Sequence, residues 1–153
     1  MTEQEENKQR LRDLLAAVDA GDIERALAFY SPDYVDHDAS EARGGSGSAI
    51  DALRRAFEQF YAAFRDTRHR LDDVVADADR VAARISVEAR HTGEILGIPA
   101  TGQLIRNDSI VIYRYERGHI RERWCRERHS TRKLLEDAAR AQSFENATPR
   151  QRE

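Results

Sequence analysis

The spacing of apolar residues is helical in the first part of the chain. Leu11 and Leu14 belong to a series spaced three to four residues apart, which predicts a helix over residues 2–20. Asp22 follows a glycine and can cap a second, shorter helix that buries apolar residues as far as Tyr30. The chain therefore begins with helices that turn an apolar side toward a core.

A short strand, a loop and a third helix are predicted next. Residues 34–37 read as a strand, and the Gly/Ser-rich residues 41–47 read as a loop that is free to move. Ser48 and Asp51 are spaced as a capping box with Asp in place of the usual Glu, which predicts the start of a helix. Aromatic residues recur along this helix at helical spacing.

Beyond the third helix the apolar residues alternate with polar ones, which predicts β-strands. The predicted strands cover residues 68–76, 80–91, 104–116 and 119–128. Short turn sequences separate the first pair and the last pair, so neighbouring strands are expected to be antiparallel. Ser130 can cap a final helix, and from Gln142 onward the polar residues lose periodicity, which predicts a frayed tail.

This order of elements predicts an α+β fold. We expect a cone-shaped, curved antiparallel sheet wrapped around three N-terminal helices, with a C-terminal helix. The prediction is one domain over residues 1–141 and a flexible polar tail over residues 142–153. Long strands that curl around a single group of helices leave one open end, where we expect a pocket.

Composition narrows the class of protein. A chain of 153 residues with 40% hydrophobic residues suits one domain with one core. The net charge is -3, and the arginine-rich residues 114–133 alternate with apolar ones, which argues against nucleic-acid binding. Cys125 is the only cysteine, which rules out an intramolecular disulfide and favours a reducing, cytoplasmic location. The sequence has no apolar run long enough to span a membrane, and its N-terminal residues lack the layout of a signal peptide.

Two histidines are candidates for proton transfer at the pocket. His91 ends a predicted strand just before a Gly-rich connection, where an imidazole could accept or deliver a proton near neutral pH. Alternatively, His91 pins the turn that follows it. His37 lies on the short first strand and, if it points inward, could pair with His91 or hold a substrate oxygen; the alternative is a structural histidine with satisfied hydrogen bonds.

The last strand adds a charged pair. By alternation, Glu122 and Arg126 share a face with Ile120 and Trp124, and this face is predicted to point inward. A buried carboxylate beside an arginine is either a structural ion pair or a tuned acid/base. Trp124 would form a wall of the pocket.

Alternation and helical spacing place further residues around the pocket. Side chains on the fourth strand could donate hydrogen bonds to a ligand oxygen, and aromatic side chains could close the pocket, although such aromatics also occur as plain core. These candidate substrate-binding residues are Tyr30, Tyr34, Phe57, Phe60, Tyr61, Asn107, Ser109, Tyr113 and Trp124. No spacing of His or Cys resembles a known metal site.

Five segments in order resemble the SnoaL-like polyketide cyclase (ester cyclase) family. They are YVDHD at 34–38, FRDTR at 64–68, DRVAAR at 79–84, HTGEILGIPATG at 91–102 and GHIRERW at 118–124. The resemblance implies a nuclear-transport-factor-like cone, often a homodimer through its sheet, with no cofactor or metal. It also implies a general acid/base that deprotonates a carbon beside a carbonyl of a small-molecule substrate, after which an intramolecular aldol reaction closes a ring.

One position departs from the family pattern. Members usually carry an aspartate after the tryptophan strand, the acid/base in cyclases, and here that position holds Arg128 or, in another alignment, Ser130. The leading hypothesis is a cofactor-independent cyclase, isomerase or lyase acting on a carbonyl-containing, polyketide-like or cyclic substrate. In this hypothesis His91 and His37 move the proton, and Glu122 with Arg126 orients it. The alternatives are a non-catalytic small-molecule binding protein and an epoxide-hydrolase-like enzyme on the same fold.

Overall fold

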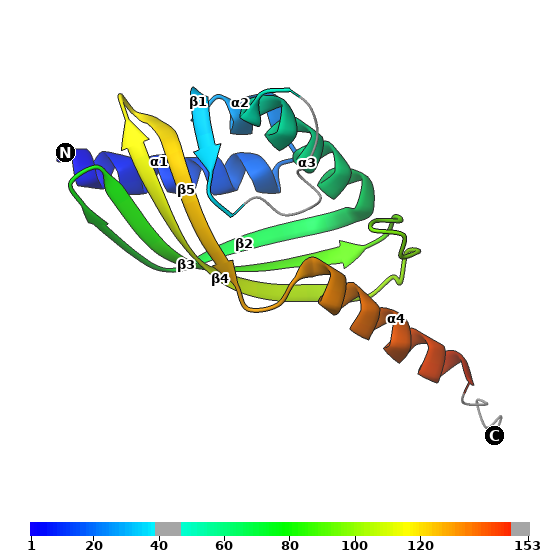
Figure 1. Ribbon diagram of the computed structural model, residues 1–153. Helices are drawn as coiled ribbons and strands as arrows, with labels where there is room; N and C mark the ends of the chain where they lie inside the picture. Colours follow the sequence, from blue (N-terminus) through cyan, green and yellow to red (C-terminus); the bar gives the residue numbers. More distant parts are fainter. Residues whose placement is uncertain (39–46, 148–153) are drawn as a thin grey trace.

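The computed structural model describes residues 1–38 and 47–147 of the chain (Figure 1). The elements, in chain order, are α1 (Glu3–Asp19), α2 (Ile23–Leu27), β1 (Tyr30–Asp36), α3 (Ala49–Ala63), β2 (Phe64–Asp77), β3 (Arg80–His91), β4 (Leu104–Glu116), β5 (His119–Glu127) and α4 (Thr131–Ala147). The α+β order predicted from the sequence is confirmed. Within the described residues, no helix is long and apolar enough to cross a membrane.

The helix starts follow the capping residues. The Thr2 hydroxyl accepts a hydrogen bond from the backbone N–H of Glu5, which begins α1. At α3 the predicted capping box is present: Ser48 Oγ accepts from the N–H of Asp51, and the Asp51 carboxylate accepts from the N–H of Ser48, both at 3.1 Å. Asp in place of Glu therefore still satisfies two backbone donors at the helix end.

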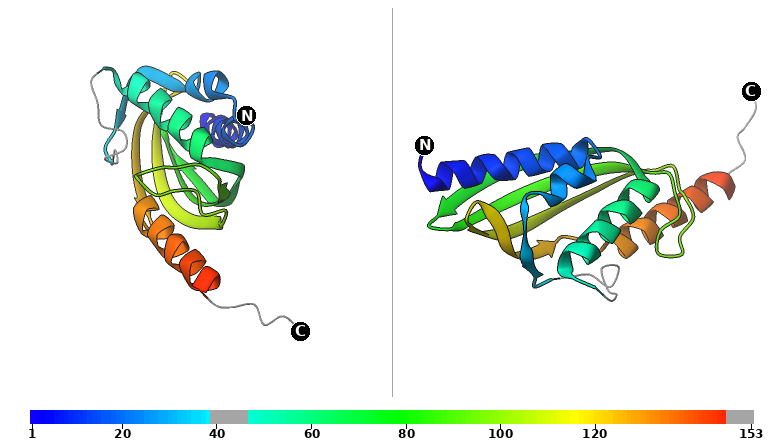
Figure 2. Two further views of the ribbon diagram at one scale, coloured as in Figure 1. Left: turned by 90° about the vertical axis from the view of Figure 1, so that its right-hand side faces the viewer. Right: turned by 90° about the horizontal axis from the view of Figure 1, so that it is seen from above.

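The five strands form one sheet in the order β1-β5-β4-β3-β2. All neighbours are antiparallel except β1, which runs parallel to β5. The sheet curls, and α1, α2 and α3 cover its concave face, whereas α4 projects away from the body (Figures 1 and 2). This is the predicted cone, with one edge strand more than the four long strands expected to form it.

Two separate clusters of apolar side chains fill the concave side. The main cluster joins α1 and α2 to the part of the sheet near the β2–β3 and β4–β5 hairpins, and it includes Leu11, Val81 and Ile120. The second cluster lies at the other end of the sheet and includes Phe64, Ala89 and Leu135.

Gly93 lets the chain leave β3 close to the end of α3. A Cβ atom at Gly93 would lie 2.2 Å from the carbonyl oxygen of Ala62, so no side chain fits there. The N–H groups of Thr92 and Gly93 both donate to the carbonyl of Ala63, at 2.8 and 3.0 Å. This contact holds the connection over residues 92–103 against the third helix.

Three boundaries differ from the sequence prediction. Tyr30 starts β1 instead of ending the second helix, because α2 stops at Leu27. β2 begins at Phe64, four residues early, since an irregular pairing between Arg65 and Arg68 lets the strand continue straight from α3. Helix α4 continues through residues 142–147, which were predicted to belong to the tail. The rest of that tail, and residues 41–46 of the predicted loop, lie outside the described residues.

Candidate functional site

A β-bulge in the last hairpin reverses the predicted facing of β5. Arg114 pairs with Glu122 but the next residue, Tyr115, pairs with Ile120, so Arg121 is the extra residue on the β5 side. Ile120 is fully buried on the concave face as predicted. After the bulge, however, Glu122 is on the convex face with Arg114. The prediction that Glu122, Trp124 and Arg126 point inward with Ile120 is therefore wrong.

Glu122 belongs to a cluster on the convex face. Its carboxylate accepts hydrogen bonds from Arg114 and, at 3.0 Å, contacts Nε2 of His37. These contacts, Arg114 first and His37 second, hold the pKa of Glu122 below its usual range. The His37 ring stacks on Trp124 with centroids 4.6 Å apart and planes 4° from parallel, while Arg80 lies 5.4 Å from the Trp124 ring. Glu122 is thus an ionised partner in a surface cluster.

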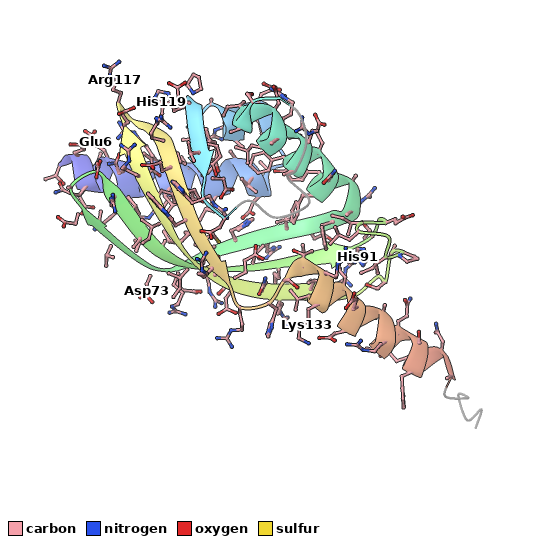
Figure 3. All side chains as sticks on the ribbon, viewed as in Figure 1. Glu6, Asp73, His91, Arg117, His119 and Lys133 are labelled. Atoms are coloured by element: carbon pink, nitrogen blue, oxygen red, sulfur yellow. The ribbon has the colours of Figure 1, made fainter. Side chains whose placement is uncertain are left out.

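His37 and His91 are not brought together. Trp124, on which His37 stacks, pairs with Ile112, and Ile112 pairs with Ala82. Ala82 precedes His91 by nine residues of extended strand, a span of about 30 Å. Figure 3 shows His91 at the end of the sheet opposite to His119. The expected pairing of the two histidines is corrected accordingly.

The inward charge on β5 is Arg123. Arg123 Nη1 lies 3.1 Å from Asp36 Oδ2, and the two side chains are only 14% and 8% exposed. Arg126 is 79% exposed and binds the carboxylate of Asp38, so it does not pair with Glu122. Cys125 also packs against the main cluster. Each of these placements follows from the same bulge.

His91 is fully buried and fastens the following connection to β3. Its Nδ1 accepts a hydrogen bond from the N–H of Thr101 at 3.3 Å and lies 3.0 Å from Oγ1 of Thr101. Its backbone bonds to Gln103 and Gly102. An acceptor at Nδ1 places the proton of the neutral ring on Nε2, which has no hydrogen-bond partner within the described residues. This geometry favours the turn-pinning interpretation of His91.

The burial of His91 makes stability depend on pH. Burial lowers the pKa of His91 below 6.5, against a smaller opposing effect of the Gly93 backbone. The unfolded chain therefore takes up a proton at higher pH than the folded protein, and the free energy of unfolding falls as pH drops below about 6.5. This one group contributes a slope of at most about 1.4 kcal/mol per pH unit.

We expect His91→Asn to flatten this pH dependence. Urea unfolding at several pH values between about 7 and 5 measures it, with His119→Asn as the control, because His119 is exposed in a hairpin. A slope in His91→Asn equal to that of the wild type would contradict the assignment of a neutral, buried His91.

Between the two clusters several inward residues are half-buried, and we call this level of the sheet the gap. On β3, Ile85 and Ala89 are 6% and 4% exposed, whereas Val87 between them is half-buried. On β4, the inward residues Asn107 and Ser109 are also half-buried, and burial resumes at Val111. These residues therefore keep part of their surface accessible at this level of the sheet.

His69 is the titratable residue on β2 at this level, since it pairs with Val87. Its Nδ1 lies 2.5 Å from Oδ1 of Asp19, and its backbone N–H donates to Oδ2 of the same carboxylate at 2.9 Å. The side chains of His69 and Asp19 are 17% and 28% exposed. The pair was not predicted from the sequence, because Asp19 lies 50 residues before His69, at the end of α1.

Tyr61 borders this pair from α3. Its hydroxyl donates to the carbonyl of Val18 at 2.7 Å. Burial, and then the charges of Asp19 and Asp22, raise the pKa of Tyr61 to about 12. Tyr61 therefore stays protonated at neutral pH and keeps its hydrogen bond to the end of α1. We define the concave-face site as His69, Asp19, Tyr61, Val87 and Asn107.

Most other predicted pocket residues lie in the core. Tyr30, Tyr34 and Tyr113 are buried in the main cluster, with Phe57 packed against it, and Phe60 packs on the second cluster. Asn107 uses its side-chain amide locally: Nδ2 donates to the carbonyl of His129 at 2.8 Å, and Oδ1 accepts from the N–H of Asp108 at 3.0 Å. Among the predicted set, Tyr61, Asn107 and Ser109 lie closest to the gap.

The position of the family aspartate holds no base. Arg128 is exposed and forms an ion pair with Asp108 at 2.9 Å. Ser130 caps α4, because its hydroxyl accepts from the N–H of Lys133 at 3.2 Å. In residues 1–38 and 47–147, no group of three or more His, Cys, Asp or Glu side chains is arranged to hold a metal ion.

A hollow of about 560 Å³ borders the same level of the sheet. It is lined by residues 68–70, 86–88 and 106–108, together with Arg128 and His129. His69, Val87 and Asn107 are inward residues, whereas the residues on either side of each of them occupy convex-face positions. Most of the lining therefore belongs to the convex face, and the hollow is not the predicted pocket at the mouth of the cone.

Comparison with known proteins agrees with this architecture. The model of the SnoaL-like polyketide cyclase family matches residues 8–127. TsrD from Streptomyces laurentii superposes with a TM-score of 0.72 at 26% identity, over 84% of this chain and 92% of its own. AclR, a proposed hydroxylase from Streptomyces galilaeus, has a TM-score of 0.74 at 26% identity, over 90% and 98%.

A third structure, IdmH from Streptomyces antibioticus, is a proposed polyketide cyclase. It superposes with a TM-score of 0.70 at 22% identity, over 87% of this chain and 97% of its own, which supports the fold alone. No curated protein sequence gives a significant match.

Proposed function

The chain belongs to the SnoaL-like polyketide cyclase family, and from that premise we propose that it is a cofactor-independent enzyme that moves a proton on a carbonyl-containing small molecule. The pair of His69 and Asp19 beside the gap in the concave face carries this proposal. The substrate class is polyketide-like or cyclic, as the family implies. Because Arg128 and Ser130 offer no carboxylate base, the base must come from elsewhere in the site.

His69 has the geometry of an oriented general base. With its Nδ1–H held by the Asp19 carboxylate, Nε2 is the ring nitrogen that remains for a substrate. Abstraction of a proton from the carbon beside a carbonyl gives an enolate and an imidazolium, and the nearby carboxylate stabilises the imidazolium. The enolate carbon can then attack a second carbonyl of the same molecule, which forms the C–C bond and turns that carbonyl into an alkoxide. The alkoxide takes the proton back from the imidazolium of His69.

Proton exchange tests this function without knowledge of the natural substrate. Cyclic and aromatic 1,3-dicarbonyl compounds are incubated with the protein in D₂O, and loss of the proton between the carbonyls is followed by NMR. We expect saturable exchange above the buffer rate. Exchange at the buffer rate for every compound that binds would overturn the proposed chemistry and leave a binding protein.

That outcome corresponds to the second candidate function. A non-catalytic small-molecule binding protein is favoured by one observation, the arginine or serine at the position of the family aspartate. Binding is measured by calorimetry with the same compounds. Binding without exchange supports this candidate, whereas binding with exchange supports the enzyme.

We also propose that the protein forms a homodimer through the convex face. Val75 and Ile110 are 65% and 60% exposed on this face, and Ile112 at 36% lies beside Trp124. Contiguous exposed apolar residues of this kind are typical of protein interfaces. The patch draws residues from β2, β4 and β5 on one face of the sheet, which suits a two-fold contact between identical sheets.

Ile110→Glu is expected to separate such a dimer, because it replaces an exposed apolar side chain of the patch with a charge. Light scattering after gel filtration should give twice the chain mass of 17.5 kDa for the wild type and the single mass for the variant. Val35→Glu, on the edge strand β1, is the control. A monomeric wild-type protein would contradict the proposed dimer.

A further inference from the structure

Four arginines border the hollow on the sheet, although the chain as a whole carries a net charge of -3. Arg68, Arg70, Arg106 and Arg128 line it, against two acidic lining residues, Glu88 and Asp108. The lining therefore has a formal excess of two positive charges. This excess stands out locally because the rest of the chain is acidic on balance.

The strand pairing arranges these charges in two rows across the convex face. In the first row Arg68 pairs with Glu88, which pairs with Arg106; in the second, Arg70 pairs with Ser86, which pairs with Asp108. Strands lie about 4.8 Å apart, so the outer members of a row are about 10 Å apart at the backbone. Two arginine side chains can converge on one group across that distance.

The ion pairs leave donors available in the first row. Arg106 uses Nε for Glu88, at 3.2 Å, so the terminal nitrogens of its guanidinium remain. Arg68 has no ion-pair partner among the described residues. In the second row, Arg128 contacts Asp108 at 2.9 Å and Arg70 contacts Asp72 at 2.5 Å, so both of these arginines have acidic partners.

The pair between Arg106 and Glu88 can open at little cost. The two side chains are 73% and 38% exposed, and exposed ion pairs contribute about 1 kcal/mol or less to stability. An incoming oxyanion can therefore draw Arg106 away from Glu88. Ser86 in the second row presents a hydroxyl on the same face, although that hydroxyl also contacts Asp72.

We propose that this hollow binds the oxyanion group of a small molecule, a phosphate or a carboxylate, between Arg68 and Arg106. Guanidinium groups bind both anions through two parallel hydrogen bonds. His69, Val87 and Asn107 also border the hollow, but Arg68 and Arg106 occupy convex-face positions, and the proposal does not depend on the proposed catalytic function. Glu88 lies between the two arginines, and its negative charge repels the anion and so lowers the affinity of the site for it.

Calorimetric and NMR titrations with phenyl phosphate, benzoate and inorganic phosphate test this site in the full-length protein. We expect saturable binding with shifts of the backbone amides of residues 86–88 and 106–108. Affinity should fall as NaCl is raised from about 20 to about 200 mM, because screening weakens exposed charges. Tighter binding of phenyl phosphate than of inorganic phosphate would indicate a small-molecule ligand, and equal binding would indicate a site for the oxyanion alone.

Three substitutions in the lining are expected to change the affinity for the anion, two by weakening it and one by strengthening it. Arg68→Gln and Arg106→Gln should each weaken binding at least about tenfold, since each removes charge-assisted hydrogen bonds. Glu88→Gln should tighten it, a direction that a folding defect would not produce. Arg132→Gln, exposed on α4 outside the hollow, is the matched control. Shifts that do not saturate, or equal weakening in Arg68→Gln and Arg132→Gln, would overturn the proposal.

Discussion

Replacing His69 with alanine is expected to lower the rate of proton exchange on a bound 1,3-dicarbonyl compound by about 10²–10⁴-fold, the usual contribution of a positioned general base. The reason is geometric: Asp19 fixes Nδ1 of His69 at 2.5 Å and leaves Nε2 as the basic atom. The binding constant of the compound should change much less than the rate, because the loss concerns the proton transfer.

Asp19→Asn tests the orientation of the ring separately. An amide can hold His69 in the wrong tautomer and cannot stabilise the imidazolium, so the rate should fall at least about tenfold with His69 still present. His119→Ala is the control for loss of an exposed histidine. A His69→Ala protein that folds normally and exchanges at the wild-type rate would remove His69 from the mechanism, and a loss confined to His91→Ala would move the base to His91.

The strand boundaries were predictable because alternation is a local property. Residues 80–91 and 104–116 were predicted as strands, and the structure gives the same limits. Asn107, Ser109 and Tyr113, predicted to face the pocket, do lie on the concave face, since the pairing of the two strands runs without a shift from Arg80 to Arg90. The capping box at Ser48 was predictable for the same reason: both partners lie within one helical turn.

The facing of β5 was not predictable from alternation. One extra residue at Arg121 exchanges the two faces for the rest of the strand. Alternation instead predicts that Ile120 and Trp124 share one face, because both are apolar and they are four residues apart. Trp124 is instead covered on the convex face by His37 and Arg80, so its apolar surface does not require the concave core.

The concave-face site was not predicted from the sequence, for a different reason. His69 and Asp19 are joined only when α1 crosses the sheet above β2, and neither residue lies in a motif of the family. His91 does lie in a motif of the family, and for that reason it was predicted to be a catalytic base. Its complete burial and its bonds to Thr101 come from the folding of residues 92–103 back onto β3, a tertiary contact that spacing alone does not reveal.

Arg123→Met is expected to lower the free energy of unfolding by about 3–5 kcal/mol, because it removes the cationic partner of the buried Asp36 carboxylate. The N–H of Asp38, which also donates to Asp36 at 3.1 Å, carries no full charge to replace it. Asp36 is 8% exposed and ends β1, which pairs with β5 at only three described positions. The ion pair therefore fastens the edge strand to the sheet. Urea unfolding followed by the fluorescence of Trp124, the only tryptophan, measures the effect.

The double variant Asp36→Leu/Arg123→Met separates the loss of a partner from the loss of attraction. In the double variant both charges are replaced with apolar side chains, so no unbalanced charge remains buried. We therefore expect the double variant to recover most of the stability lost in Arg123→Met. Arg126→Met, which breaks the exposed pair with Asp38, should cost no more than about 1 kcal/mol. If the double variant were as unstable as Arg123→Met, the attraction itself would hold β1 in place, and the edge strand would depend on a buried charge for its position.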